Sequence, residues 1–126
     1  MPVQDFSHFN LRAHRPLLDE LRDFYVRIVG LQVGPRPPLN HYGYWLYAGP
    51  RAVLHLSEAR PDDVRPANVI STYDHTSFQC TDPQQYAQQL RAAGIAFRVN
   101  QVPLTGDLQY FFQDPAGNGV ELVFES

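Results

Sequence analysis

Lysine is absent from this sequence, and all ten basic residues are arginine. We interpret this bias as genomic composition, without functional meaning. The arginines are scattered along the chain and the net charge is −3, so the sequence lacks the basic footprint that is typical of nucleic-acid binding. Nucleic acid is therefore not an expected partner.

Cysteine is also scarce, because Cys80 is the only one. A single cysteine excludes a disulfide within the chain and fits a reducing compartment. No stretch approaches the roughly 18 apolar residues of a membrane span, and the opening MPVQDFSHF lacks the pattern of a secretory signal. We expect a cytoplasmic protein that does not associate with membranes.

Charged residues are few as well, at 18% of the chain against a usual value of roughly 25%. Hydrophobic residues make up 44%, and no run of one charge sign or of Pro, Gly and Ser indicates disorder. A chain of 126 residues fits one domain. We therefore expect a folded globule with a substantial core.

The predicted elements occur twice in the same order. Three pairs of residues have nearly constant offsets: His75 minus His8 is 67, Gly94 minus Gly30 is 64, and Glu121 minus His55 is 66. The first half predicts a strand at 6–13, a helix from Pro16 that Gly30 caps, and strands at 42–49 and 51–58. The second half predicts a strand at 74–80, a helix from Pro83 to Ala93 with Thr81 or Asp82 as N-cap, and strands at 95–99, 108–113 and 119–124.

This repeat predicts the fold class. It is α+β, with two β-α-β-β-β modules, at about 5–58 and 72–126, joined by a linker at 59–71 within a single domain over 1–126.

The last strand follows the turn-forming run DPAGNG, which we interpret as a hairpin connection over 114–119. Val120, Leu122 and Phe124 then alternate with Glu121, so the acid faces away from these apolar side chains. The base rate for charged residues would leave Glu121 in water. The repeat indicates another role.

The polar residue in the first predicted strand of each module is a histidine, His8 or His75, and the last strand carries His55 or Glu121. All four are predicted on the face opposite the helices. A lone strand histidine is usually not a ligand, but imidazoles and a carboxylate at equivalent positions of a repeat favour one divalent ion, Zn, Ni, Co, Mn or Fe(II). No short motif such as HExxH is present. His14 and His41 fall in predicted loops, with His41 a candidate for the rim of the cleft.

Five stretches carry a resemblance to a known family: HFNLRA, DFYVRIVGLQV, VLHLSE, DHTSFQC and above all DPAGNGVELVF, which has the ending DPxGNxxEL. They resemble the vicinal oxygen chelate superfamily, which includes glyoxalase I, bleomycin-resistance proteins, extradiol dioxygenases, fosfomycin-resistance enzymes and methylmalonyl-CoA epimerase. The resemblance implies a curved eight-stranded mixed sheet around a metal cleft, often in a homodimer whose sites use strands of both chains.

By position, the resemblance implies that His8, His75 and Glu121 are metal ligands. His55 stands where glyoxalase I has a glutamate that moves the substrate proton and the epimerase has a glutamine, while fosfomycin enzymes generally lack a ligand there. This replacement argues against glyoxalase activity itself. Arg12 falls where glyoxalase I has an arginine that contacts glutathione, which alone is weak support for a thiol cofactor.

The number of protein ligands separates the candidate reactions. With His8, His55, His75 and Glu121 bound, an octahedral ion keeps two positions for a substrate that chelates through adjacent oxygens, as in a glyoxalase-like lyase or isomerase with Glu121 or His55 as proton carrier. Without His55, the remaining triad suits an Fe(II) ring-cleaving dioxygenase. We favour the first reaction by a small margin.

A non-catalytic small-molecule-binding resistance protein is a third candidate, although such proteins typically lack the metal ligands. In each case the expected partner is a small molecule. Arg12 and the aromatic residues Tyr44, Tyr110 and Phe112 are candidate substrate contacts, drawn from an aromatic set in which strand alternation lets only some members face the cleft.

Overall fold

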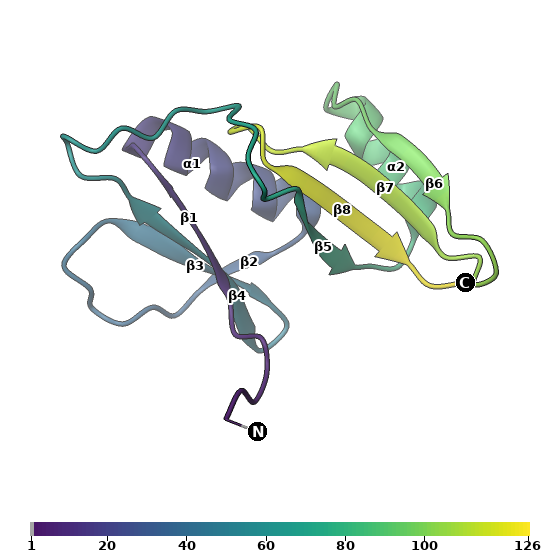
Figure 1. Cartoon of the computed structure of the whole chain (residues 1–126), viewed down its shortest axis with the longest axis horizontal. Coiled ribbons are helices and arrows are strands. Elements are labelled where there is room, and N and C mark those ends of the chain that lie inside the picture. The colour runs from purple at the N-terminus through teal and green to yellow at the C-terminus, as the bar shows by residue number, and fades with distance from the viewer. Residues whose placement is uncertain (1) are drawn as a thin grey trace. The chain divides into compact units, whose positions relative to one another are not determined.

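The computed structural model describes residues 2–126. Met1, the first residue of the predicted single domain, lies outside them. The chain divides into two compact units, the first ending at Pro66 and the second comprising Ala67–Ser126 (Figure 1). Each unit contains one β-α-β-β-β module with its own four-stranded mixed sheet. The α+β class and the two predicted modules are therefore confirmed, whereas the single domain over 1–126 stays a prediction.

The first unit has its strands in the order β1-β4-β3-β2. The strand β1 is parallel to β4, and the other neighbours are antiparallel. Its elements are β1 (Phe9–Ala13), α1 (Arg15–Phe24), the π-helix η1 (Tyr25–Val29), β2 (Gln32–Gly34), β3 (Gly43–Ala48) and β4 (Arg51–Glu58).

Helix α1 covers one face of this sheet, where it contacts β1, β3 and β4. Leu18 and Leu21 are buried on α1, and Leu54 and Leu56 are buried on β4. Each such side chain contributes roughly 1.5–3 kcal/mol to stability through burial. The helical segment predicted to Gly30 is confirmed in extent, but its last five residues wind as a π-helix, ended by Gly30 at a φ of 100°.

The second unit has the equivalent strand order, β5-β8-β7-β6, with β5 parallel to β8. Its elements are β5 (His75–Gln79), α2 (Pro83–Ala92), β6 (Arg98–Gln101), β7 (Leu108–Gln113) and β8 (Gly119–Phe124). Helix α2 packs on one face of the sheet. The Tyr110 hydroxyl of β7 donates to the carbonyl of Pro83 at 3.0 Å, and the Tyr86 ring lies 5.8 Å from that of Phe124 on β8.

The parallel strand pairs of the two units have equivalent registers, so the sequence repeat is also present in the structure. Asn10 of β1 lies opposite His55 of β4, and Ser77 of β5 lies opposite Glu121 of β8. His8 and His75 each precede these β1 and β5 residues by two positions. In each unit, the first histidine therefore lies diagonally across from the predicted ligand of the last strand, which is His55 in the first unit and Glu121 in the second.

Some boundaries differ from the predicted ones. The first strand begins at Phe9, so His8 precedes it, and β6 begins at Arg98, three residues later than predicted. The strand β2 was not predicted, because three residues with exposed Gln32 and Val33 are too short to show alternation. The N-cap of α2 is Asp82, one of the two predicted candidates. Its side chain makes no capping hydrogen bond, and its φ is 61°.

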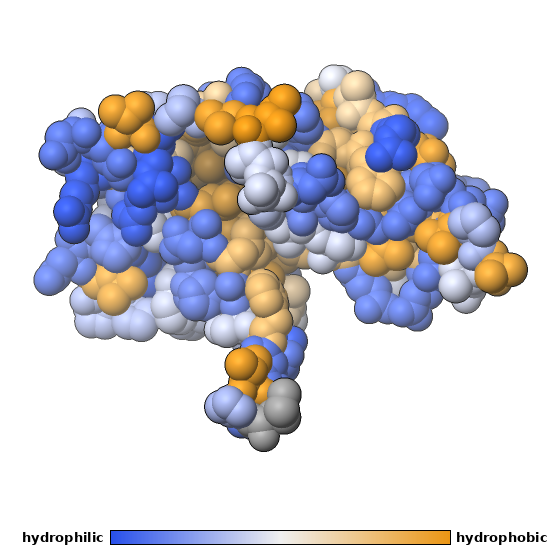
Figure 2. Space-filling model, viewed as in Figure 1, coloured by the Kyte–Doolittle hydropathy of each residue, from blue (hydrophilic) through white to orange (hydrophobic). Residues whose placement is uncertain are grey.

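The segment between the sheets leaves several apolar side chains in solvent. Val64 is 84% exposed and Ile70 is 98% exposed. On the surface shown in Figure 2, hydrophobic residues are interspersed with hydrophilic ones. Within residues 2–126, no helix has the length and apolar character needed to cross a membrane.

Candidate functional site

The His75 ring and the Glu121 carboxylate meet in the second unit. Nε2 of His75 lies 3.0 Å from Oε1 of Glu121, whose side chain is only 8% exposed. Glu121 faces away from the helix because its neighbours Val120 and Leu122 occupy the buried, helix-covered face. The predicted orientation of Glu121 is thus confirmed.

Surrounding polar groups fix the orientation of both side chains. Oδ2 of Asp74 lies 2.7 Å from Nδ1 of His75, which leaves Nε2 directed at Glu121. Nε2 of Gln109 donates to Oε2 of Glu121 at 2.9 Å, and Asn100 in turn donates to Oε1 of Gln109 at 2.7 Å. These contacts leave Oε1 of Glu121 facing His75. A hydrogen bond to the second nitrogen of a histidine is the usual way in which proteins orient a metal-binding imidazole.

The spacing of this pair fits two ligands of one ion. Ligand atoms bound at about 2.1 Å and at a right angle to each other are about 3.0 Å apart. His75 Nε2 and Glu121 Oε1 have that separation, 3.0 Å, which is also the distance of the direct ion pair that they form with each other when the imidazole is protonated. An imidazole nitrogen with a carboxylate oxygen is also a donor set that Zn and Fe(II) accept.

The equivalent residues of the first unit form an aromatic stack. The His55 ring lies between those of His8 and Trp45, with centroid distances of 3.7 and 4.0 Å and interplanar angles of 15° and 9°. Oγ of Ser7 lies 2.9 Å from Nδ1 of His8, so the residue before this histidine also contacts its Nδ1. This contact occupies Nδ1 of His8, as the Asp74 contact occupies Nδ1 of His75.

Arg36 was missed in the sequence and lies close to His55. Its Nη2 atom donates to the carbonyl of His41 at 2.9 Å. A Cβ at Gly43 would lie 2.1 Å from the backbone oxygen of Leu56 and 3.1 Å from this Nη2 atom, so the glycine is needed mainly for the close approach of the β4 backbone. Burial lowers the pKa of His55, and the positive charges of His8 and Arg36 act in the same direction. A hydrogen bond to the Ala52 backbone partly opposes this shift.

Each histidine site borders an open hollow. The hollow of the first unit has a volume of about 540 Å³ and is lined by Ser7, His8, Trp45, Arg51, Ala52 and His55. That of the second unit has about 250 Å³, with Asp74, His75, Arg98 and Phe111 among its lining residues. Arg98 lies 4.4 Å above the Phe111 ring, so a cation is held beside His75. The first volume lies within the range of small-molecule sites.

Phe112 lines the hollow beside His75, whereas the hydroxyls of Tyr44 and Tyr110 contact the helices, and the roles of all three in binding substrate stay predictions. Tyr110 and Phe112 are 5% and 6% exposed, on the face of the sheet that α2 covers. Their neighbours Gln109 and Phe111 face Glu121 and His75. The sequence identified aromatic strands but not which alternate residues of each strand would face the site.

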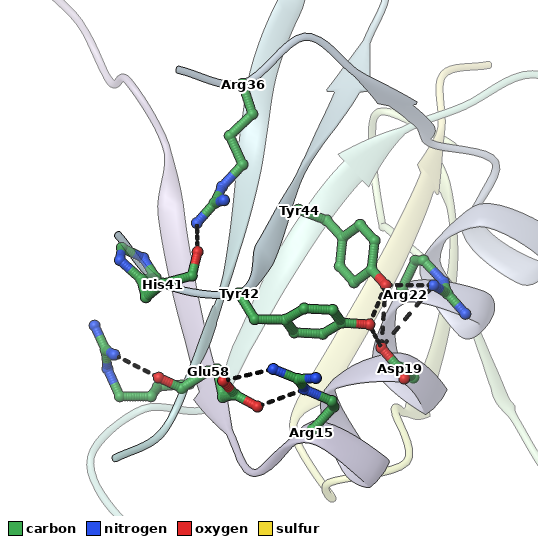
Figure 3. A network of polar contacts seen from close by, with 9 residues as sticks. Arg15, Asp19, Arg22, Arg36, His41, Tyr42, Tyr44 and Glu58 are labelled. Atoms are coloured by element: carbon green, nitrogen blue, oxygen red, sulfur yellow. Dashed lines mark hydrogen bonds and ion pairs between the residues drawn. The ribbon is translucent and has the colours of Figure 1, made fainter. Parts of the chain in front are cut away.

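Tyr44 instead joins a polar network with α1 (Figure 3). Arg22 donates to the Tyr44 hydroxyl at 2.5 Å, the two tyrosine hydroxyls are also 2.5 Å apart, and Tyr42 donates to Asp19 at 2.7 Å. The hydrogen bond to Asp19 raises the pKa of Tyr42 well above its usual range, helped by that to Tyr44. This network ties the helix to β3, so Tyr44 has a structural role.

Arg12 lies on the same face of β1 as His8, by alternation, but contacts the protein itself. Nη1 of Arg12 donates to the carbonyl of Glu58 at 3.0 Å. The side chain borders a polar hollow of about 480 Å³, together with Arg60, Asp62, Asp63 and Arg65. Two further arginines and two carboxylates therefore surround Arg12, and its role in binding substrate stays a prediction.

The predicted ligands thus lie as two pairs, His8 with His55 and His75 with Glu121. Within residues 2–126, no three or more His, Cys, Asp and Glu side chains are grouped so as to hold a metal ion. Ser7 and Asp74 were not predicted as site residues, although each directly precedes a repeat histidine and could have been found by that shared position. Gln109 left no comparable signal, whereas Trp45 belonged to the aromatic set from which the candidate substrate contacts were drawn.

Comparison with known proteins identifies the class of fold that the two β-α-β-β-β modules form. The model of the Glyoxalase/Bleomycin resistance protein/Dioxygenase superfamily matches residues 6–122. The chain therefore belongs to this superfamily, which confirms the resemblance inferred from its motifs. No curated protein matches the chain.

Solved structures agree with this assignment at the level of the fold. A lactoylglutathione lyase from Agrobacterium tumefaciens is 22% identical, with a TM-score of 0.68 and coverage of 98% of this chain and 96% of that one. A glyoxalase family protein from Enterococcus faecalis is 23% identical, with a TM-score of 0.67 and coverage of 98% and 99%. An integron cassette protein from V. cholerae is 16% identical, with a TM-score of 0.72 and coverage of 100% and 98%.

Proposed function

We propose that this protein is a divalent-metal-dependent enzyme, a glyoxalase-like lyase or isomerase acting on a small substrate with adjacent oxygens. The observation that carries the proposal is the His75–Glu121 pair, whose ligand atoms lie 3.0 Å apart with both side chains held by further polar groups. Membership in the superfamily and the lactoylglutathione lyase among the similar folds support the same reaction type.

The proposed ligands are His8, His75 and Glu121, with His55 as a fourth candidate. When bound, a divalent ion would act as a Lewis acid that polarises the two substrate oxygens. The predicted homodimer and cytoplasmic location remain predictions.

Glu121 is the best-placed residue to carry a proton. Its carboxylate is buried, Gln109 holds Oε2, and Oε1 lies 3.0 Å from Nε2 of His75, so Oε1 would have to leave that partner to accept a proton. Removal of a proton beside a substrate carbonyl needs a base within hydrogen-bond reach in a site shielded from water. Arg98, held above Phe111 in the hollow beside His75, supplies a positive charge for an anionic substrate.

An Fe(II) ring-cleaving dioxygenase is the second candidate, and one observation favours it. His55 is stacked between two rings, so His8, His75 and Glu121 form the less encumbered donor set. Two histidines with one carboxylate are the ligands typical of non-haem Fe(II) oxygenases.

Elemental analysis tests metal dependence. The full chain would be purified without chelators, beside His75→Ala and the loop control His41→Ala. We expect about one divalent ion per chain in the wild type and the control, and loss of the ion from His75→Ala, because the latter removes a ligand. Absence of metal from the wild type, even after reconstitution with Zn²⁺, Ni²⁺ or Fe²⁺, would overturn the proposal.

Activity assays with the loaded protein then separate the two reactions. Turnover of 2-oxo thiol adducts without consumption of dioxygen would support the lyase or isomerase. Ring cleavage of catechols with uptake of dioxygen by the Fe(II)-loaded protein would support the dioxygenase instead.

A further inference from the structure

The guanidinium of Arg36 lies on the face of the first sheet that α1 does not cover, which we call the open face. The Tyr44 hydroxyl contacts α1, so its neighbours in β3, Gly43 and Trp45, belong to the open face. Nη2 of Arg36 is 3.1 Å from the position of a Cβ at Gly43, which places the guanidinium over that face. The register of β3 with β4 sets Trp45 opposite His55, so both residues are close to Arg36.

Arg36 is a partly buried cation without an anionic partner. Within residues 2–126, its one hydrogen bond runs from Nη2 to the carbonyl of His41 at 2.9 Å, and no carboxylate pairs with it. Its Nε atom is buried there without any hydrogen-bond partner. Native proteins pair nearly all buried polar groups, because an unpaired one costs free energy. The guanidinium therefore has hydrogen-bonding capacity that the protein itself does not use.

The strands around Arg36 contain no acid that could neutralise it. Glu58 is the only acidic residue in β1, β2, β3 and β4, and it pairs with Arg15 of α1 at 2.7 Å on the other side of the sheet. The charge of Arg36 also acts on His55, where it adds to the lowering of the pKa that burial causes. The open face is therefore positively charged near His55 and favours an anion.

The loop that carries Arg36 is held in one conformation by the protein itself. Three of its residues at 35–38 are prolines, which restrict the backbone. The Tyr47 hydroxyl donates to the carbonyl of Pro35 at 2.6 Å, and Arg36 spans the loop to the carbonyl of His41 (Figure 3). An arginine that is already ordered loses less conformational entropy when it binds a ligand.

We propose that Arg36 anchors a carboxylate-binding site on the open face of the first unit. Its guanidinium is planar and carries one positive charge, so it matches the shape and charge of a carboxylate. Trp45 and His55 line the hollow of about 540 Å³, which gives room for the rest of a small organic acid. The site uses no metal ion and no group of the second unit, so the inference goes beyond the proposed function.

Nitrogen NMR of the Arg36 side chain in the metal-free, full-length wild type tests the proposal without any variant. The buried Nε–H reports directly on the guanidinium. The probe is pyruvate, and methyl pyruvate, its uncharged ester, is the control. We expect pyruvate to shift the Arg36 signal in a saturable way and the ester to leave it unchanged. No shift with pyruvate, or equal shifts with both compounds, would overturn the proposal.

The variant Arg36→Gln separates binding from a merely structural role. We expect the affinity for pyruvate, followed at the backbone amides of the open face, to fall about 10–100-fold, the loss expected for a hydrogen bond to a charged group. The melting temperature should stay the same or rise, because an unpaired, partly buried charge does not stabilise the fold.

Arg27→Gln is the matched control, since it makes the same change at an exposed arginine of η1 and should keep wild-type affinity. Wild-type affinity in Arg36→Gln would overturn the proposal. A lower melting temperature with unchanged affinity would also overturn it, by assigning Arg36 to the loop alone. No metal is present in these experiments, so their outcome is independent of the proposed metal enzyme.

Discussion

Nε2 of His75 and Oε1 of Glu121 lie 3.0 Å apart across two parallel neighbouring strands, β5 and β8. Neighbouring groups hold both side chains of this pair in position. Asp74 lies against the imidazole, Gln109 donates to the other carboxylate oxygen, and Glu121 is buried. A pair held in this way needs little reorganisation to bind an ion, and that preorganisation underlies the first prediction.

Replacing Gln109 with leucine should weaken Zn²⁺ binding by about 10–100-fold, because the Glu121 carboxylate loses the donor that orients it. The volume of the side chain is nearly kept, so the sheet should remain folded. The measurement is chelator competition, with circular dichroism as the check on folding.

Gln85→Leu is the matched control, since Gln85 is an exposed residue of α2. It makes the same chemical change away from Glu121 and should leave the affinity unchanged. Wild-type affinity in Gln109→Leu would show that Glu121 does not depend on this hydrogen bond.

Gly117 should be intolerant of alanine for two reasons. Its φ is 87°, and an added Cβ would lie 2.4 Å from Oδ1 and 2.9 Å from Cα of Asn68. The backbone of Asn68 cannot simply move aside, because its N–H donates to the carbonyl of Ala116 at 2.7 Å. We expect Gly117→Ala to destabilise the protein beyond the cost of the left-handed backbone alone, which urea denaturation would measure.

Gly49→Ala is the control for the backbone cost. Gly49 also has a positive φ, 57°, but an added Cβ would have no atom within 4 Å. The free energy of unfolding should fall by about 1–3 kcal/mol more in Gly117→Ala than in Gly49→Ala, the usual cost of overpacking. Equal losses would mean that the contact with Asn68 relaxes without cost.

The Arg15–Glu58 ion pair should make stability depend on pH in the acid range. The hydrogen bond from Arg15 at 2.7 Å lowers the pKa of Glu58 below its ordinary value of 4.5. Because folding lowers this pKa, the carboxylate stabilises the fold above the unfolded-state value, and the contribution disappears as the pH falls through the folded-state pKa. Glu58→Gln should therefore be less stable than the wild type at neutral pH, and the difference should vanish in acid.

Urea denaturation of both proteins between neutral pH and about pH 3 would measure this difference across the range in which Glu side chains titrate. Glu20→Gln, which removes one carboxylate from an exposed glutamate of α1, is the control for the substitution itself. A constant difference between Glu58→Gln and the wild type at every pH would point to packing of the side chain and not to its charge.

The sequence predicted best the elements whose pattern is local. The strands at 51–58, 108–113 and 119–124 are confirmed to the residue, because alternation and turn residues bound each of them. The internal repeat is confirmed in the strand register, which sets Asn10 opposite His55 and Ser77 opposite Glu121.

The parts that failed depend on neighbours distant in sequence. The register between β3 and β4 sets Trp45, and not Tyr44, opposite His55. Alternation within a single strand does not reveal this register. The stacking of His55 and the hydrogen bond from Gln109 likewise require strands that meet only in the fold. The joint binding of one ion by His8, His75 and Glu121 stays a prediction.

The matched register of β1 with β4 and of β5 with β8 has a consequence for how such a protein can arise. Tandem duplication of one ancestral module copies a diagonal pair of side chains into both halves of the gene, so neither half has to evolve its site anew. Once two copies exist, the shared position can diverge: one half carries an acid at 121 and the other a histidine at 55. Selection can then retain binding chemistry in one copy while the other acquires a new specificity.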